Sequence, residues 1–292
     1  MVFHPPVAIV AKAGDAGKYK VGLPAWNMVL RGFLSGSFIA MGGALATVCS
    51  TGILATDAAL QFGTASAGFS QLILGAVFPV GLIITVLTGA ELFTGDAMLA
   101  PMAAFIHKVS WAQVANLWIW VYIGNFIGSV WFAYIMAYGP CVSFNAAGAA
   151  TVTAFGSRAI AIGVAKTSYV GIMGMWSALL KGIACNWLVN LAILLGICAD
   201  DLIGKFFGIW FPIMAFVSTG FEHSIANMYF IPAGILTQGW ITDPTKINTA
   251  LNWVSMWTNN LIIVTIGNII GGMIFVGLLY WVAFRKEIQA LK

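Results

Sequence analysis

The sequence carries very little charge. Only 8% of its 292 residues are Asp, Glu, Lys or Arg, whereas 61% are hydrophobic. Soluble domains usually carry about 25% charged residues, so this composition excludes an ordinary soluble domain and places the chain in a membrane. Alternating ten-residue strand patterns are also absent, which argues against an outer-membrane barrel. The mean hydropathy of +0.95 agrees with helical spans of about 20 apolar residues each.

Histidine, cysteine and clustered charge are scarce as well. The three histidines and four cysteines show no CxxC or other metal-binding spacing, so we predict no metal site and no cofactor. The net charge of +4 comes from basic residues that form no stripe, which argues against a nucleic-acid partner. The first apolar run is too long for the core of a cleavable signal peptide. No constellation of nucleophile, base and orienting group indicates an enzyme, so no catalytic residues are predicted.

Long apolar runs are what the sequence does contain. Six of them are long enough to cross a bilayer as helices, so we predict an all-α, multi-pass integral membrane protein. Most Lys and Arg fall on one side of this layout and only Arg158, Lys166 and Lys246 on the other. The positive-inside rule then puts both termini in the cytoplasm of a protein of the plasma membrane. The predicted spans lie near residues 27–48, 69–106, 112–138, 169–198, 202–236 and 257–284.

These spans divide the chain into two halves with short flanking segments. The N-terminal segment is expected to form, in part, an amphipathic helix on the membrane surface, and the central connection a loop with a short helix. The parts are a cytoplasmic N-terminal segment (1–25), a first repeat (26–138), a connecting loop (139–168), a second repeat (169–284) and a cytoplasmic tail (285–292).

Two of the apolar runs are interrupted near the middle. The second run breaks at TGAELFTGD (Thr88–Asp96) and the fifth at GFEHSIANM (Gly220–Met228). Each break combines glycine with ionisable side chains, which are costly in a membrane span and mark a pathway or site by default. Irregular backbone at membrane depth is stable only where it is buried in protein or lines a cavity. We therefore predict that each of these spans consists of two half-helices joined by a loop.

Three features recur in the same order in the two halves. A basic residue followed by glycine occurs in the first and fourth spans, at Arg31 and Lys181. Gly-x-Glu opens both breaks, and Gly-Asn-x-Ile-Gly occurs in the third and sixth spans. Because each half has three crossings, the two halves are inverted relative to each other in the membrane. Paired interruptions at corresponding positions are typical of a binding site between inverted repeats.

The breaks offer chemistry that suits an anion. Half-helices that start at mid-membrane point their positive N-terminal ends toward the midplane. His223 is the only histidine inside a predicted span, and its imidazole can donate a hydrogen bond or a proton to a passing weak acid. The alternative is a buried structural histidine. Thr94 offers a hydroxyl to the same anion or caps its half-helix, and the sequence leaves both readings open.

Other residues of the breaks support the loops or narrow the path. Glu91 and Glu222 have the same offset from their glycines, and we expect their carboxylates to accept loop N–H groups. Asn227 is expected to support the same loop as Glu222. Apolar side chains near the breaks would form dry constrictions that reject hydrated ions, with ordinary core packing as the alternative. These side chains are Phe78, Leu82, Leu92, Phe93 and Phe216.

At these motifs the chain closely resembles the formate/nitrite transporter family, over essentially its whole length. The match is carried by GAELFTGD, GFEHSIANM, KGIACNWLV (Lys181–Val189) and IGNIIGG (Ile266–Gly272). Within the family the chain looks nearest to archaeal formate channels. The resemblance implies an aquaporin-like protomer of six helices, a pore in each subunit and a homopentamer.

The resemblance also implies roles for particular residues. The pore centre would consist of His223, Thr94 and Asn186, flanked by the apolar constrictions named above. The family has a vestibule lysine shortly before the fourth span. Lys166 is the candidate here, although it lies about one helical turn further upstream of Asn186 than the family pattern.

The resulting expectation is a channel or proton-coupled carrier for a small monovalent anion. Formate is the first candidate, and nitrite and hydrosulfide are the alternatives in the same class. A membrane redox subunit that binds haem or quinone is a remote alternative, because paired histidine ligation of haem needs more than one buried histidine. A water or glycerol channel would share the fold, but its paired Asn-Pro-Ala breaks are missing. The expected partners are the anion, the lipid bilayer and further copies of the chain.

Overall fold

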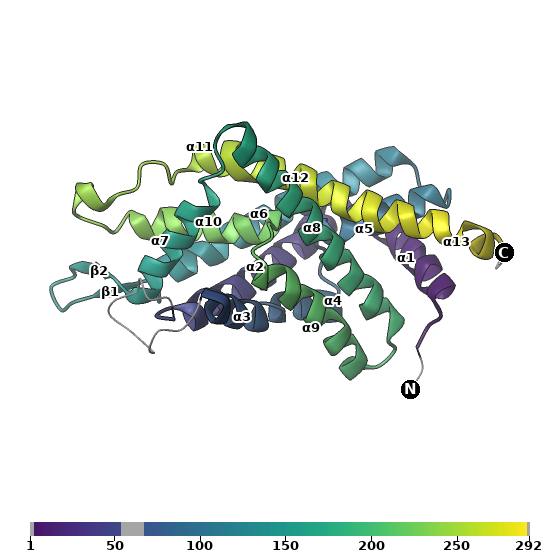
Figure 1. The fold of residues 1–292 in the computed structure, drawn as a ribbon, viewed down its shortest axis with the longest axis horizontal. Coiled ribbons are helices and arrows are strands. Elements are labelled where there is room, and N and C mark those ends of the chain that lie inside the picture. The colour runs from purple at the N-terminus through teal and green to yellow at the C-terminus, as the bar shows by residue number, and fades with distance from the viewer. Residues whose placement is uncertain (1–2, 54–66, 291–292) are drawn as a thin grey trace.

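Long apolar helices make up most of the structure. The computed structural model describes residues 3–53 and 67–290. Among the described residues, five helices are long and apolar enough to cross a membrane, and the apolar helix Leu202–Ser218 is shorter. Figure 1 shows an elongated bundle with both chain termini at one end and a β-hairpin at the other.

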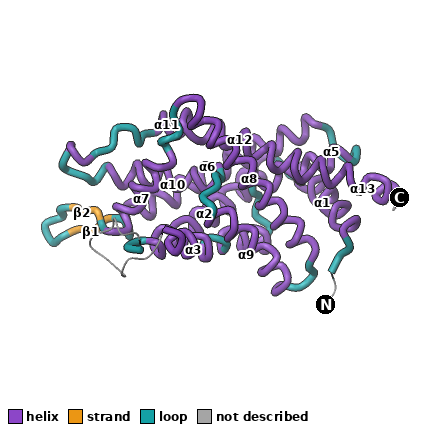
Figure 2. Tube along the Cα trace, in the orientation of Figure 1, coloured by secondary structure: helices purple, strands orange, loops and turns teal. Residues whose placement is uncertain are grey.

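The elements follow one another in two similar series. The first series is α1 (Pro6–Val21), α2 (Ala25–Ser50), α3 (Ala67–Val77), α4 (Val80–Thr88), α5 (Phe93–Phe105) and α6 (Trp111–Tyr138). The antiparallel strands β1 (Val142–Phe144) and β2 (Ala150–Val152) connect it to the second series, as Figure 2 shows. The second series begins with α7 (Ala154–Lys166), α8 (Gly171–Cys198), α9 (Leu202–Ser218), α10 (Ser224–Gln238) and the 3-10 turn η1 (Pro244–Lys246). It ends in one long helix with two π-helical segments, formed by α11 (Trp253–Met256), η2 (Trp257–Leu261), α12 (Ile262–Ile269), η3 (Ile270–Leu278) and α13 (Leu279–Ala290).

Both predicted interruptions are present. In the second span, α4 ends at Thr88 and the second half-helix, α5, begins at Phe93 after a short loop. In the fifth span, α9 ends at Ser218 and the second half-helix, α10, begins at Ser224. Gly89 and Gly220 open the two loops with φ of 75° and 71°, in the left-handed region that favours glycine. These two glycines explain why the helices break where they do.

The central connection holds a hairpin that the sequence did not indicate. Residues 139–168 were expected to form a loop with a short helix, and the helix is α7. The strands have only three residues each, too short for a recognisable alternation. Their turn is held by the Asn145 side chain, whose Oδ1 accepts hydrogen bonds from the backbone N–H groups of Ala147 and Ala149.

One face of the helix α1 packs against the rest of the protein, and the other, with Lys12, Asp15 and Lys18, is exposed. Val10 and Ala13 are buried, and a Cβ on Gly17 would lie 2.0 Å from the carbonyl oxygen of Leu99 in α5. The segment therefore contains the expected helix with an apolar and a polar face, and its place at the membrane surface stays a prediction. The apolar face of α1 covers α5, because the small residues on that face allow the two backbones to come close.

Small residues also bring α2 and α6 together. A Cβ on Gly36 would lie 2.2 Å from the carbonyl oxygen of Asn125, and one on Gly128 would lie 2.0 Å from that of Phe33. Such close backbone contacts are typical of membrane helices with small residues four apart. The same contact recurs in the second half, between Gly271 of η3 and the carbonyl of Ile183 in α8.

This packing makes a stability prediction for Gly36. We expect Gly36→Ala to lower the free energy of unfolding by about 1–3 kcal/mol, because an added methyl group forces the two helices apart. Gly95→Ala is the matched control, since its nearest neighbouring atoms are 3.8 Å from the added Cβ. Denaturant unfolding of both variants in the same detergent checks the difference. Equal stability of the two variants would contradict the packing argument.

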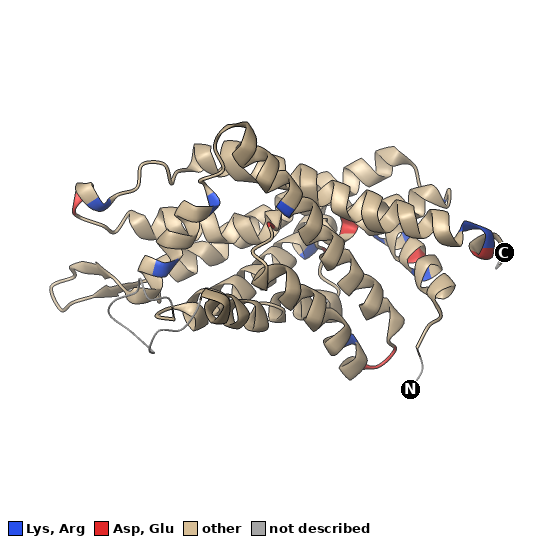
Figure 3. Cartoon of the chain, in the orientation of Figure 1, with Lys and Arg blue, Asp and Glu red and all other residues tan. Residues whose placement is uncertain are grey.

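Charged residues are rare along the membrane-spanning helices and common at the ends of the bundle. Figure 3 shows long stretches of helix without Lys, Arg, Asp or Glu, and charged residues gathered toward the ends of the bundle. A few charges lie deeper, and they include Glu91 and Asp96 in the first half and Glu222 in the second, each with a nearly fully buried side chain. These buried carboxylates mark the two breaks.

Candidate functional site

The two half-helices that begin inside the bundle meet through their first residues. Thr94, in the first turn of α5, and His223, the N-cap residue of α10, are joined by a hydrogen bond of 2.9 Å between Oγ1 and Nε2. Both side chains are almost fully buried. The structure therefore brings together two residues that the sequence places 129 positions apart.

The second nitrogen of His223 fixes the proton on its ring. Nδ1 accepts a hydrogen bond of 3.0 Å from the backbone N–H of Ala226 and so caps α10. Because a backbone N–H can only donate, Nδ1 carries no proton in this arrangement, and the neutral ring has its proton on Nε2. His223 therefore presents an N–H donor to Thr94 or to a molecule that takes the place of the Thr94 hydroxyl.

Thr94 is oriented by amides of α8. Its backbone carbonyl accepts hydrogen bonds from the side chains of Asn186, at 3.0 Å, and Asn190, at 3.1 Å. Its hydroxyl makes no side-chain cap of α5, whose N-cap residue is Leu92. Of the two roles left open for the Thr94 hydroxyl, the geometry supports the one toward His223. Asn186 reaches this centre through Thr94.

An apolar gap surrounds the imidazole. The space between the two halves at this level has no room for a water molecule. Four of the five predicted constriction residues line it, together with Ile39, Val189, Ile213 and His223; the four are Phe78, Leu82, Leu92 and Phe216. The Phe216 ring stacks on His223 with a centroid separation of 5.7 Å.

Phe93 lies outside this gap. Its ring packs edge-on against Tyr122, with centroids 4.9 Å apart, and against Trp118. Phe93 is the first residue of α5, and its backbone N–H donates to Asn125, which turns the side chain toward α6. We therefore do not include Phe93 in the constriction.

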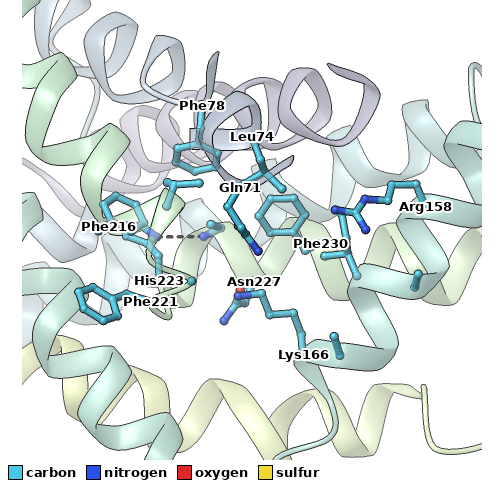
Figure 4. A pocket seen from close by; sticks show the side chains of 16 residues that line it. Gln71, Leu74, Phe78, Arg158, Lys166, Phe216, Phe221, His223, Asn227 and Phe230 are labelled. Atoms are coloured by element: carbon cyan, nitrogen blue, oxygen red, sulfur yellow. Dashed lines mark hydrogen bonds between the residues drawn. The ribbon is translucent and has the colours of Figure 1, made fainter. Parts of the chain in front are cut away.

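A cavity with charged side chains in its lining opens on each side of the gap. The distal mouth, near the hairpin, has a volume of about 240 Å³ and includes Lys166, Arg158 and Asn227 in its lining. Figure 4 shows the Lys166 and Arg158 side chains across this cavity from Phe78, Phe216 and His223. The terminal mouth, beside α1, has a volume of about 250 Å³ and includes Lys20, Arg31, Glu91, Asp96 and Lys205 in its lining.

Glu222 organises the distal mouth. Its carboxylate accepts hydrogen bonds from Lys166 at 2.7 Å, Tyr169 at 2.8 Å and Asn227 at 2.7 Å. Lys181 in turn donates to the Tyr169 hydroxyl at 3.0 Å. The carboxylate thus accepts from side chains, and the expectation that it accepts loop N–H groups was wrong. The loop N–H of Glu222 donates to the Lys181 carbonyl instead.

Glu91 has the corresponding place in the terminal mouth. Its carboxylate binds Lys20, and the guanidinium of Arg31 lies 3.6 Å away. Arg31 also donates to the Tyr19 hydroxyl at 3.2 Å. Tyr19 lies twelve residues before Arg31, just as Tyr169 lies twelve residues before Lys181. The backbone N–H of Glu91 donates to the carbonyl of Arg31, and that of Glu222 donates to the carbonyl of Lys181. In each half a lysine from the preceding short helix, Lys20 of α1 or Lys166 of α7, also binds the buried glutamate.

Two asparagines hold the loops, and the sequence interpretation missed their function. Asn125 accepts from the N–H of Phe93 and donates to the carbonyl of Glu91; Asn268 accepts from the N–H of Ser224 and donates to the carbonyl of Glu222. Their signal was visible in the repeated Gly-Asn-x-Ile-Gly motif. Each asparagine satisfies backbone groups that a broken helix leaves without partners, so both loops keep their shape at membrane depth.

Comparison with known proteins identifies the fold. A family model described as formate/nitrite transporter matches residues 7–282. The chain belongs to the formate/nitrite transporter family. It is a multi-pass membrane protein with the inverted halves and broken second and fifth spans described above, and its family consists of anion channels and transporters, not enzymes.

Relatives within the family share most of the chain. A probable formate transporter of Methanothermobacter thermautotrophicus is 40% identical over 288 residues, covering 96% of this chain and 97% of that protein. The formate channel FocA of Escherichia coli K12 is 32% identical over 291 residues, covering 97% and 95%. A solved pentameric formate channel with formate bound aligns with a TM-score of 0.72 and 32% identity, covering 89% of this chain and 98% of that one.

Proposed function

We propose that this protein is a channel for small monovalent anions and that formate is its principal substrate. The observation that carries the proposal is the Thr94–His223 pair in a dry gap between two mouths lined with cations. The names of the related formate transporter and formate channels support formate as the substrate. Each protomer would contain its own path from mouth to mouth.

The mouths attract the anion. Lys166 at one mouth and Lys20 at the other are partly exposed, with 19% and 16% of their side-chain surface accessible, so each can contact both its carboxylate partner and an arriving anion. The N-terminal ends of α5 and α10 add positive potential toward the gap. Formate would therefore be concentrated at the point where it loses its water.

The apolar gap then excludes a charged substrate and admits a neutral one. An anion without water in an apolar constriction would be very costly, whereas a neutral acid with one hydrogen bond is tolerated. We propose that formate crosses as formic acid and that the His223 Nε2–H donates a hydrogen bond to it in place of the Thr94 hydroxyl. Because Nδ1 is occupied by the Ala226 N–H, the proton that accompanies formate comes from the mouth and not from His223.

The setting of the channel is part of the same proposal. Its relative is a pentameric formate channel, and the glycine-rich contacts leave apolar faces of α2 and α6 exposed, with Trp26, Leu30 and Ile127 among them. We propose a homopentamer in the plasma membrane with both termini in the cytoplasm, in line with the distribution of Lys and Arg.

Formate uptake into proteoliposomes tests the function. We expect rapid uptake of labelled formate that excess unlabelled formate suppresses most strongly, with weaker competition by nitrite and hydrosulfide. Uptake of nitrite or hydrosulfide without formate would keep the anion channel and overturn the substrate. Liposomes that pass none of the three would overturn the function.

A further inference from the structure

The internal repeat places a carboxylate at one mouth where the other mouth has an amide. Asp96 lies five residues after Glu91, and Asn227 lies five residues after Glu222. The two positions are equivalent in space as well, because Asn125 and Asn268 hold corresponding backbone groups of the two loops. The two halves therefore differ by one ionisable group at matching positions.

The amide donates to its neighbouring glutamate, whereas the carboxylate shares a single cation with its glutamate. Asn227 Nδ2 donates to Glu222 Oε2 at 2.7 Å. An ionised Asp96 cannot donate to Glu91 in the same way, because a carboxylate only accepts. The Asp96 side chain has no accessible surface, and within the described part of the chain neither of its oxygens accepts a hydrogen bond from a group other than Lys20. The Lys20 ammonium lies 3.1 Å from Asp96 Oδ1 and also binds Glu91, so one cation serves both carboxylates.

We propose that Asp96 is a proton-binding site of the terminal mouth. A proton taken from the water of that mouth forms an O–H bond on one Asp96 oxygen, and this hydroxyl donates to Glu91 as the Asn227 amide donates to Glu222. Protonation removes the repulsion between two carboxylates that share one ammonium. It also completes a hydrogen bond that the repeat provides at the distal mouth and lacks here.

The surroundings of Asp96 define the charge that protonation changes. The elements packed against α5 contribute few other polar groups near Asp96. Trp118 of α6 donates to the Asp96 carbonyl, and α8 contributes the uncharged side chains of Asn186 and Asn190. The segments η3 and α12 carry no titratable residue. The titratable side chains that line the same cavity are Tyr19, Lys20, Arg31, Glu91 and Lys205.

A bound proton makes the two mouths alike in charge. Without the proton, the cations that line the terminal mouth (Lys20, Arg31 and Lys205) face the two carboxylates of Glu91 and Asp96. With the proton on Asp96, they face only the carboxylate of Glu91. Around the distal mouth, Lys166, Arg158 and Lys181 likewise accompany the single carboxylate of Glu222. Acid on the terminal side therefore raises the positive charge that captures anions there, whereas the described residues of the distal mouth include no second carboxylate. The terminal mouth thus senses the pH of its own compartment.

Infrared spectroscopy tests the proton site without reference to transport. In purified wild-type protein we expect a carboxylic-acid C=O band that grows as the pH is lowered and is missing from Asp96→Asn. An identical band in Asp96→Asn would overturn the proposal. The reciprocal Asn227→Asp variant should gain a second band of this kind, so the test stands even if Asp96→Asn fails to assemble.

Formate flux then tests the consequence, which rests on the proposed function. Protonation of the substrate affects both sides equally, so the readout is the difference between acidifying the terminal and the distal side of vesicles with one protein orientation. In the wild type, we expect acid on the terminal side to stimulate entry more, by up to about tenfold per pH unit, the limit for one proton. Asp96→Asn should respond equally from both sides, and Asn227→Asp should gain sensitivity on the distal side. Equal responses of wild type and Asp96→Asn would overturn the sensing role and leave the channel function intact.

Discussion

Replacing His223 by asparagine is expected to reduce formate flux roughly 10- to 100-fold. Asparagine is among the best N-cap residues, so its side chain can still accept the hydrogen bond from Ala226 and preserve α10. What it cannot do is reach Thr94, 2.9 Å from the imidazole Nε2, or a substrate in that place. A lost hydrogen bond to a polar or charged group is worth about 1.5–3 kcal/mol, which corresponds to the stated range.

The matched control is His107→Asn. His107 is an exposed histidine in the loop between α5 and α6, and its φ of 61° is one that asparagine tolerates. We expect its formate flux to equal that of the wild type in the same proteoliposome assay. If His223→Asn passed formate as fast as His107→Asn, His223 would be a structural residue and the proposed pore centre would be wrong.

Replacing Lys166 by methionine is expected to destabilise the protein by about 3 kcal/mol. The substitution leaves the Glu222 carboxylate buried without its cation, and removal of one partner of a buried ion pair costs about 3–5 kcal/mol. We choose the low end because 19% of the Lys166 side chain is accessible and because Tyr169 and Asn227 continue to donate to Glu222. Denaturant unfolding in detergent measures the loss.

Two further variants separate charge from packing. Lys166→Met combined with Glu222→Gln removes both charges and should recover most of the lost stability, while Arg158 and Lys181 keep the net positive charge of the distal mouth unchanged. Lys246→Met breaks a pair in which the lysine is 72% accessible, and it should change stability by less than about 1 kcal/mol. A double variant no more stable than Lys166→Met alone would show that the charge of Glu222 is not the cause.

The sequence predicted the spans and breaks well because their physical signals are local. Twenty apolar residues in a row specify a membrane helix, and glycine beside Glu222 or Glu91 can be stable at membrane depth only in a protected loop. The same local signals brought His223 and Thr94 together as a candidate centre. They could not give the hydrogen bond between them, because it depends on how two helices 129 residues apart meet.

The contact partners of the site's side chains could not be predicted from the sequence. The carboxylates of Glu91 and Glu222 were assigned to loop N–H groups, but α1 and α7 bring Lys20 and Lys166 to them instead. Both helices lay outside the predicted repeats, since their small residues carry no strong span signal. Phe93 shows the same limit in another way: its apolar side chain fits a constriction equally well in sequence, and only the direction of α5 turns it toward Tyr122.

The most direct test of the account records formate uptake and internal pH together in the same proteoliposomes. If formate crosses the dry gap at His223 as the neutral acid, about one proton should enter with each formate, and uptake should generate no electrical current. Formate uptake that leaves the internal pH unchanged and carries current would mean that the bare anion passes the gap, which would contradict the central claim.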